Sequence, residues 1–136
     1  MLSLNAKGLA VASDYLDDGT LTLMEGASAI YSIRLQNPDS RESTVKVDYS
    51  GDFMKIAGFK EEYILPPQSS TIIEFNITAP EYEKNRDEFI LGYTVYQLPG
   101  ESGGGLPFLT KINKNFKLKV VKNPNKFRIN YEYAAY

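Results

Sequence analysis

A short alternation of apolar and polar residues, closed at both ends by prolines, constrains the fold of this chain more than any other feature. Ile73, Phe75 and Ile77 alternate with polar neighbours, which is the period-two pattern of a half-buried β-strand. Proline cannot donate a main-chain hydrogen bond to a ladder, so it bounds a strand. The bounding residues are Pro66, Pro67 and Pro80. The stretch therefore predicts one strand between two enforced breaks.

The same alternation recurs along the chain. It is strictest in residues 29–36, where Ala29, Tyr31, Ile33 and Leu35 share one face. In residues 89–98 both faces are apolar, which favours a central position in a sheet. Strands are predicted at residues 9–11, 20–23, 29–36, 44–49, 54–56, 73–78, 89–98 and 106–121. Seven or eight short strands without a convincing helix indicate an antiparallel β-sandwich, with a barrel as the alternative.

Turn signals separate these strands. Asn37-Pro38-Asp39-Ser40 predicts a tight turn and therefore a hairpin between residues 29–36 and 44–49. Connections this short favour antiparallel pairing. A chain of 136 residues is about the size of one domain. We predict a single domain over residues 1–136, with its core in 20–121 and with 122–136 as a tail or an extra edge strand.

Composition excludes several classes of function. The chain has no cysteine and no histidine, which rules out a disulfide framework, cysteine–histidine or serine–histidine catalysis and the common zinc sites. We therefore expect no enzyme activity, no catalytic residue and no cofactor. A net charge of −2 gives no general attraction to nucleic acid, and no reading motif is present, so nucleic acid is not an expected partner.

No apolar run is long enough to span a membrane. The first seven residues, Met-Leu-Ser-Leu-Asn-Ala-Lys, lack the apolar core of a signal peptide. We expect a soluble chain whose secretion signal or membrane anchor, if the protein uses one, lies outside this sequence. The tyrosines Tyr131, Tyr133 and Tyr136 either mark the approach to such an anchor or belong to an additional edge strand.

Three segments together resemble a known group of domains. Residues 26–38 hold a glycine-led strand ending in an Asn-Pro turn, residues 45–47 read Val-Lys-Val, and residues 65–80 hold the Leu-Pro-Pro turn and an Ile-Thr-Ala-Pro strand end. This order resembles immunoglobulin-like surface modules of archaea and bacteria, of the NEW3 and CARDB types, over roughly residues 20–121; archaellar stator subunits use a similar sandwich. Pro67-Gln68 departs from the glycine that often follows proline there.

The resemblance implies an immunoglobulin-like sandwich located outside the cytoplasm or at the cell surface. Such modules serve as spacers, adhesion units or platforms, and none of their features supplies a catalytic residue. A protein partner or self-assembly is expected, and a surface polymer or glycan is a further candidate partner.

Asn76-Ile77-Thr78 is an N-glycosylation sequon. Strand alternation places Asn76 on the outer face, where a glycan could be attached. The alternative is an ordinary polar strand residue.

Asp14, Asp17 and Asp18 precede Gly19 and offer oxygen ligands of the kind that Ca²⁺ prefers. They lack the spacing of an EF-hand loop. Turn formation is the simpler explanation for these residues.

The main charge asymmetry lies between residues 102 and 131, which hold seven basic residues and no acidic one. They are Lys111, Lys114, Lys117, Lys119, Lys122, Lys126 and Arg128. A basic strand of this kind is a candidate interaction surface. The alternative is that lysines on an exposed edge strand prevent aggregation. Gly103, Gly104 and Gly105, just before it, predict a loop that could contribute contacts.

The favoured hypothesis is a non-enzymatic structural or interaction module that acts through edge-strand and loop contacts. A small carbohydrate-binding sandwich is the alternative, with Tyr82 and Tyr96 as stacking platforms, although the chain has no tryptophan. A hydrolase with paired carboxylates is the least favoured, because no motif places two acids together.

Overall fold

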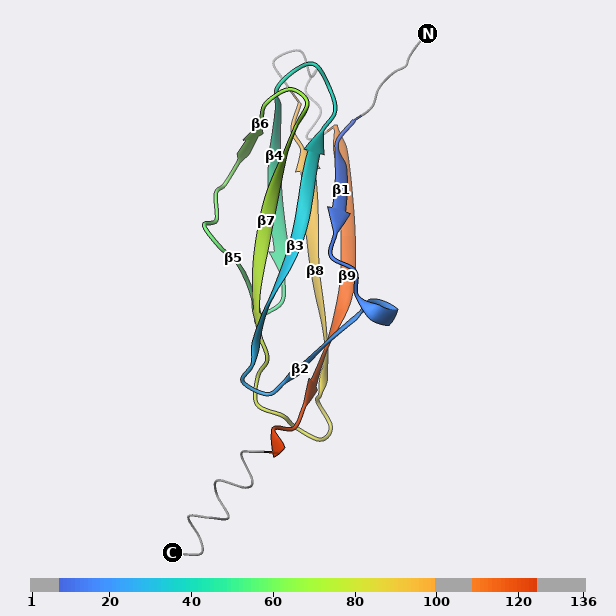
Figure 1. The fold of residues 1–136 in the computed structure, drawn as a ribbon, viewed down its shortest axis with the longest axis vertical. Helices are drawn as coiled ribbons and strands as arrows, with labels where there is room; N and C mark the ends of the chain where they lie inside the picture. Colours follow the sequence, from blue (N-terminus) through green and yellow to red (C-terminus); the bar gives the residue numbers. More distant parts are fainter. Residues whose placement is uncertain (1–7, 100–108, 125–136) are drawn as a thin grey trace, which may run out of the picture.

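A computed structural model describes residues 8–99 and 109–124 of the chain. This part is built almost entirely of strands packed in two layers (Figure 1). The elements are β1 (Ala10–Ser13), the short 3₁₀ turn η1 (Asp17–Gly19), β2 (Thr20–Met24), β3 (Ser28–Asn37), β4 (Ser43–Ser50), β5 (Met54–Ile56), β6 (Tyr63–Leu65), β7 (Ser69–Thr78), β8 (Glu88–Gln97) and β9 (Thr110–Val121). The predicted all-β sandwich is confirmed.

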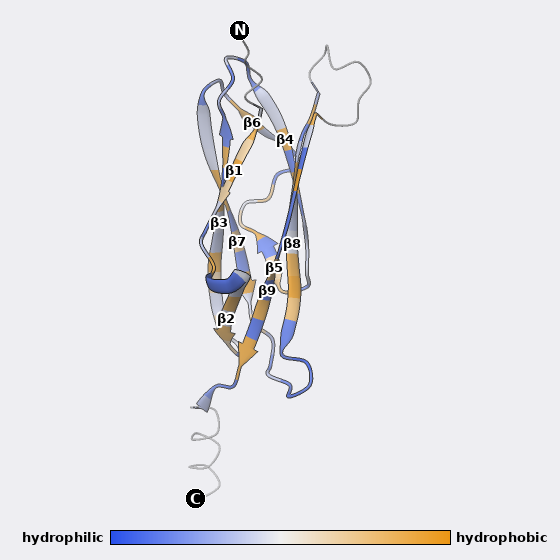
Figure 2. Ribbon diagram, turned by 90° about the vertical axis from the view of Figure 1, so that its right-hand side faces the viewer, coloured by the Kyte–Doolittle hydropathy of each residue, from blue (hydrophilic) through white to orange (hydrophobic). Residues whose placement is uncertain are grey.

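The strands form a four-stranded sheet in the order β1-β3-β7-β5 and a five-stranded sheet in the order β2-β9-β8-β4-β6. Figure 2 separates the layers, with β1, β3 and β7 on one side and β4 and β8 on the other. β8 lies in the middle of its sheet, as its two apolar faces predicted.

One pairing is parallel, which the short connections did not predict. After β1 the chain leaves the first sheet, turns at η1 and joins the second sheet as β2, beside β9. Thr20 to Met24 run parallel to Lys117 to Val121. Parallel neighbours need a long connection. β2 and β9 have one, because β3 to β8 lie between them in the sequence.

The expected hairpin between β3 and β4 is wrong. β3 pairs with β1 and β7, whereas β4 pairs with β6 and β8 in the other sheet. Asn37 accounts for this course of the chain. Its buried amide donates to the carbonyls of Leu65 and Pro66 at 3.1 Å each and of Arg41 at 2.8 Å, and its Oδ1 accepts from the N–H of Asp39. Asn37 thus ties the turn to the entry of β7 rather than folding β4 back on β3.

The core lies between the sheets and follows the predicted stripes. Ile73, Phe75 and Ile77 are buried, as are Tyr31, Ile33 and Leu35 on β3 and Phe116, Leu118 and Val120 on β9. Four aromatic rings form its centre: Tyr31 stacks on Phe116 with centroids 4.6 Å apart, and Phe75 stacks on Tyr93 at 5.5 Å. These ring contacts join side chains of β3 and β7 to side chains of β8 and β9 across the two sheets.

Candidate functional site

The strands at the sheet edges are short and cover only part of their longer neighbours. β2 pairs with β9 only from Lys117 to Val121, whereas β8 pairs with β9 from Thr110 to Lys119. Within the described residues, no strand pairs with the other side of β9 from Thr110 to Phe116. This section of β9 is an open sheet edge.

The register shows which main-chain groups point to that edge. Val120 N–H donates to the Asp87 carbonyl at 2.8 Å. In an antiparallel ladder the groups that bond to one neighbour alternate along the strand. Even-numbered β9 residues therefore bond to β8, and the main chains of Asn113 and Asn115 point the other way. In the part of the chain that the structure describes, neither main chain has a hydrogen-bond partner on that side.

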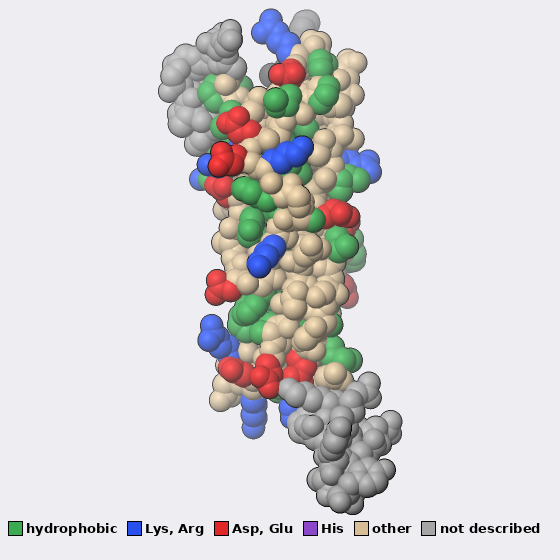
Figure 3. Space-filling view, turned by 90° about the vertical axis from the view of Figure 1, so that its left-hand side faces the viewer, with side chains coloured by type: hydrophobic (Ala, Val, Ile, Leu, Met, Phe, Trp, Pro, Cys, Tyr) green, Lys and Arg blue, Asp and Glu red, His purple; other side chains and the backbone are tan. Residues whose placement is uncertain are grey.

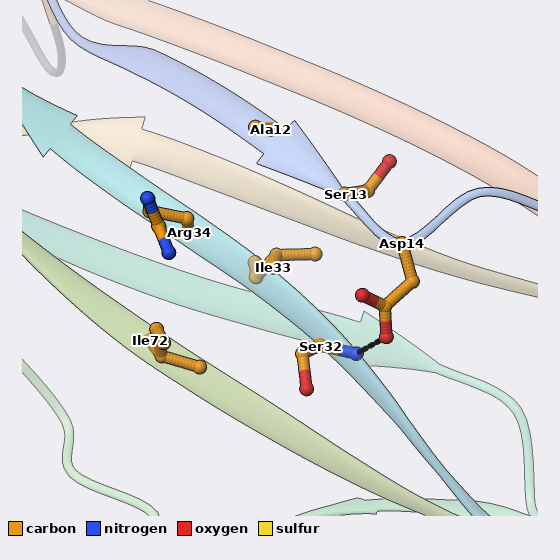
Figure 4. Close-up of a pocket in the computed structure, with 7 residues that line it drawn as sticks. All are labelled: Ala12, Ser13, Asp14, Ser32, Ile33, Arg34 and Ile72. Atoms are coloured by element: carbon orange, nitrogen blue, oxygen red, sulfur yellow. Dashed lines mark hydrogen bonds between the residues drawn. The ribbon is translucent and has the colours of Figure 1, made fainter.

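Two other edges provide a comparison. β7 is covered by β5 only along Phe75 to Ile77, and by the same alternation Ser70 and Ile72 point to an open edge. On β3, Asp14 closes the edge where β1 ends. Its N–H donates to the Ser32 carbonyl at 3.0 Å, and its Oδ2 accepts from the Ser32 N–H at 2.8 Å. Figure 4 shows this carboxylate turned to Ser32 at the rim of a hollow of about 230 Å³.

A second pocket opens beside the open section of β9. It has a volume of about 260 Å³ and lies where the chain crosses from β1 to β2; its lining residues are Ser13, Asp14, Tyr15, Leu16, Gly19, Tyr31, Lys114, Asn115 and Phe116. Tyr15 at its rim is 85% exposed. The side chain of Asn115 lies over Gly92 on the outer face of the sheet, so its main chain borders the pocket. The pocket and the open edge are therefore continuous.

A row of hydroxyl groups leads from this pocket into the core. Lys114 Nζ donates to Ser13 Oγ at 2.7 Å. Burial raises the pKa of Tyr93 to about 12; a hydrogen bond with Ser13 opposes this shift, and the neighbouring Tyr31 hydroxyl adds to it. Tyr31 is 2% exposed, and its hydroxyl has no well-formed hydrogen bond among the described residues. Incomplete hydrogen bonding of a buried hydroxyl is unfavourable, so a ligand in the pocket that bonds to this group would be stabilising.

The lysines of the predicted basic strand do not form one patch. Lys111, Lys117 and Lys119 lie on the outer face of β9, whereas Lys114 lies on the inner side at the pocket. Lys119 lies 3.9 Å from Glu88, and the ammonium groups of Lys111 and Lys122 sit over the rings of Tyr96 and Tyr82. β9 is also flanked by β2 and β8, so only its open section is an edge.

The same contacts bear on carbohydrate binding. Both predicted stacking platforms, Tyr82 and Tyr96, have a lysine over the ring at 5.5 and 5.7 Å. A sugar would have to displace that lysine, so the geometry does not favour this alternative.

The remaining predicted sites lie apart from this region. Asn76 is exposed on β7, beside a hollow of about 390 Å³ that also involves Phe53 and Lys55. Asp14 caps β3 while Asp17 and Asp18 lie in η1, and among the described residues no three acidic side chains gather into a metal site. Gly103, Gly104, Gly105, Lys126 and Arg128 lie outside the described residues.

Two further observations concern the surface. On the side that carries β5 and β6, acidic and basic side chains are interspersed (Figure 3). In residues 8–99 and 109–124, no helix is long and apolar enough to cross a membrane.

Sequence reasoning missed the pocket and the Asp14 cap. One signal pointed to the pocket: Lys114 occupies an inward position between the apolar residues Ile112 and Phe116. A charged residue at such a position marks an opening in the core.

Comparisons with known proteins show the fold. No family model matches the chain, and no curated protein sequence does, so the NEW3 and CARDB resemblance remains a prediction. A PapD-like domain of human CEP192 has a similar structure, with a TM-score of 0.55 and 11% identity. The match covers 90% of this chain and 93% of that domain's chain. The MSP-domain-like protein SSP-19 of Caenorhabditis elegans is also similar, with a TM-score of 0.53 and 13% identity. The match covers 75% of this chain and 95% of SSP-19.

A bacterial chaperone of similar fold extends the comparison. The E. coli chaperone DraB matches 85% of this chain with a TM-score of 0.51 and 12% identity. The chain spans 55% of the length of that chaperone. At these identities the likeness shows the fold alone, an immunoglobulin-like β-sandwich.

Proposed function

We propose that the chain is a non-enzymatic protein-interaction module that binds an extended segment of a partner along the open section of β9. The unpaired main chains of Asn113 and Asn115 carry this proposal. An added strand would satisfy their N–H and carbonyl groups by β-augmentation, in which main-chain bonds supply affinity and side-chain pockets supply specificity. Solved structures of similar fold include a chaperone and a complex of a pilin with its chaperone, which agrees with a protein-binding role.

The setting we propose is outside the cytoplasm or at the cell surface, as part of an assembly or of a larger surface protein. The absence of cysteine is compatible with that setting. Gly103, Gly104 and Gly105 precede β9 in the sequence but lie outside the described residues, and we propose them as further contacts for the bound segment.

Asn76 is the proposed glycan attachment site in that setting. It is exposed on the outer face of the four-stranded sheet, remote in sequence and sheet position from β9. A glycan there would leave the β9 edge accessible. Intact mass of the protein from its native source, compared with an Asn76→Gln variant, tests the assignment; equal glycan content in both would exclude it.

The function is tested by capturing partners from extracts of the source organism with the wild-type chain and two proline variants. Asn115→Pro removes an edge N–H that makes no internal bond, so the fold should persist. Ile72→Pro makes the same change on the open edge of β7 and is the matched control. We expect Asn115→Pro to lose the bound protein and Ile72→Pro to retain it. Equal capture by both variants, with both shown to be folded, would contradict the proposal.

A further inference from the structure

The uncovered section of β9 adjoins a pocket lined by Tyr31, whose buried hydroxyl makes no well-formed hydrogen bond with the described residues. We propose that this edge and pocket bind residues 127–133 of a second copy of the same chain. The inference rests on the proposed function and names its partner. This segment lies outside the described residues.

The segment has the pattern of a strand. Its residues read Phe-Arg-Ile-Asn-Tyr-Glu-Tyr from 127 to 133. Phe127, Ile129, Tyr131 and Tyr133 alternate with Arg128, Asn130 and Glu132. Such a strand has one apolar and one polar face. Paired with β9, it would turn the apolar row to the opening between the sheets and the polar row to the outer face.

The pocket fits a tyrosine side chain. Leu16, Tyr15 and Phe116 supply apolar surface, while the Tyr31 hydroxyl and Lys114 ammonium supply polar groups. A tyrosine ring next to Lys114 makes a cation–π contact, of the kind that Lys111 and Lys122 make with Tyr96 and Tyr82. The incoming hydroxyl both donates and accepts, so it can complete the hydrogen bonding of Tyr31. Tyr131 and Tyr133 are the candidates for this position.

Charge agrees with the same arrangement. On the outer face Lys117 has no ion-pair partner among the described residues. Thr20 of β2 occupies the position directly beside Lys117, so Glu132, on the polar row of the segment, would approach this lysine from a diagonal position with the opposite charge. An inward-pointing charge such as Lys114 discourages pairing with strands of arbitrary sequence. A segment with an aromatic ring at this position would instead form a cation–π contact with it.

A second copy suits the edge better than the chain's own segment. β2 occupies the same side of β9 from Lys117 to Val121, between the end of β9 and its open section. The chain's own residues 127–133 would have to pass around β2 to reach Asn115, whereas those of a neighbouring copy approach without this obstacle.

Disulfide trapping tests the proposal, because the chain has no native cysteine. Asn113→Cys and Asn115→Cys, both exposed edge positions, are each mixed in full-length form with isotope-labelled Asn130→Cys protein under mild oxidation. Lys55→Cys, exposed on β5 in the other sheet, is mixed in the same way as the control. We expect the labelled–unlabelled dimer to form at least about 10-fold faster with either β9 variant than with the β5 control, because directly opposed strand residues lie about 5 Å apart.

Sedimentation of full-length variants gives a second readout. Ile129→Lys places a charge on the apolar row and should abolish self-association, whereas Asn130→Lys adds the same charge on the polar row and should preserve it. A chain that stays monomeric at several hundred micromolar, equal trapping by Lys55→Cys, or an intramolecular disulfide in the Asn115→Cys/Asn130→Cys chain would each overturn the second-copy assignment. If partner capture that depends on Asn115 persists in that case, the proposed function stands and only its partner is wrong.

Discussion

The carboxylate of Asp14 accepts a hydrogen bond from the main-chain N–H of Ser32 over 2.8 Å and so closes the edge of β3 at the point where β1 ends. The return bond, from Asp14 N–H to the Ser32 carbonyl, continues the ladder for one more pair. One side chain thus replaces a strand partner. β9 has no such cap in the described part of the chain, and this difference separates a closed edge from an open one.

Asp14→Ala should destabilise the fold by about 1–2 kcal/mol, because it removes a charged acceptor from the Ser32 N–H. Asp14→Asn keeps an acceptor oxygen at that position, so its loss of unfolding free energy should be less than half that of Asp14→Ala. Asp17→Ala is the control, since no hydrogen bond of its side chain is seen in η1. Urea denaturation of the four proteins measures the effect; an equal loss for Asp14→Ala and Asp17→Ala would show that the cap contributes nothing.

A glycine between β4 and β5 should tolerate no side chain. Gly51 has φ +124°, and a Cβ there would overlap Cδ2 of Leu91, which is buried. Gly51→Ala therefore combines backbone strain with overpacking, and we expect a loss of about 2–4 kcal/mol. Gly58 is the matched control, because it also has a positive φ of +62° but open space around its Cβ position.

Gly58→Ala should cost only about 1–2 kcal/mol, from strain alone. Thermal melts of both variants, compared with the wild type, separate the cost of backbone strain from the cost of overpacking against Leu91. If Gly51→Ala were no more destabilising than Gly58→Ala, the contact with Leu91 would not be limiting.

The sequence predicted the parts of this fold that depend on a local period. Ile73, Phe75 and Ile77 alternate within one strand, so their burial follows from neighbours along the chain. The partner of each strand does not follow in this way. Asn37 looked like a hairpin residue, yet its amide bonds the distant Leu65 and Pro66 carbonyls, and no local pattern contains that contact.

The candidate site was predicted in part for the same reason. The basic character of β9 was visible in the sequence, but its lysines divide between the two faces and make separate local contacts. The opening beside Lys114 arises because the chain leaves one sheet after Ser13 and joins the other at Thr20. It depends on the relative length of β1, β2 and β9, which alternation alone does not determine.

Tyr93 should make stability fall at high pH. Burial raises its pKa from 10.0 to about 12, so the folded state holds the phenol proton more tightly than the unfolded state. The resulting stabilisation is complete below pH 10 and is lost progressively as pH rises from about 10 to about 12, by on the order of 2 kcal/mol. Urea denaturation at pH 8, 10 and 11 should show a smaller decline in Tyr93→Phe than in the wild type; parallel declines would rule out this residue as the cause.

Hydrogen exchange should alternate residue by residue along the open section of β9. The amides of Ile112, Lys114 and Phe116 point to β8 and are bonded, whereas those of Asn113 and Asn115 point away from it. In dilute protein, Asn113 and Asn115 should exchange at least about 10-fold faster than their neighbours. Lys119 is the control, since β2 covers its outward side, and its amide should stay protected.

The dependence of this exchange on protein concentration shows whether a second copy binds the open section of β9. If residues 127–133 of a second copy pair with β9, the Asn113 and Asn115 amides must become protected as the protein concentration rises, because an added strand bonds the groups that were open. Exchange at Ser70 and Ile72, on the uncovered section of β7, should not change with concentration. Protection of Asn113 and Asn115 already at the lowest concentration would mean that the edge is covered within one chain, and would remove the basis for strand addition at β9.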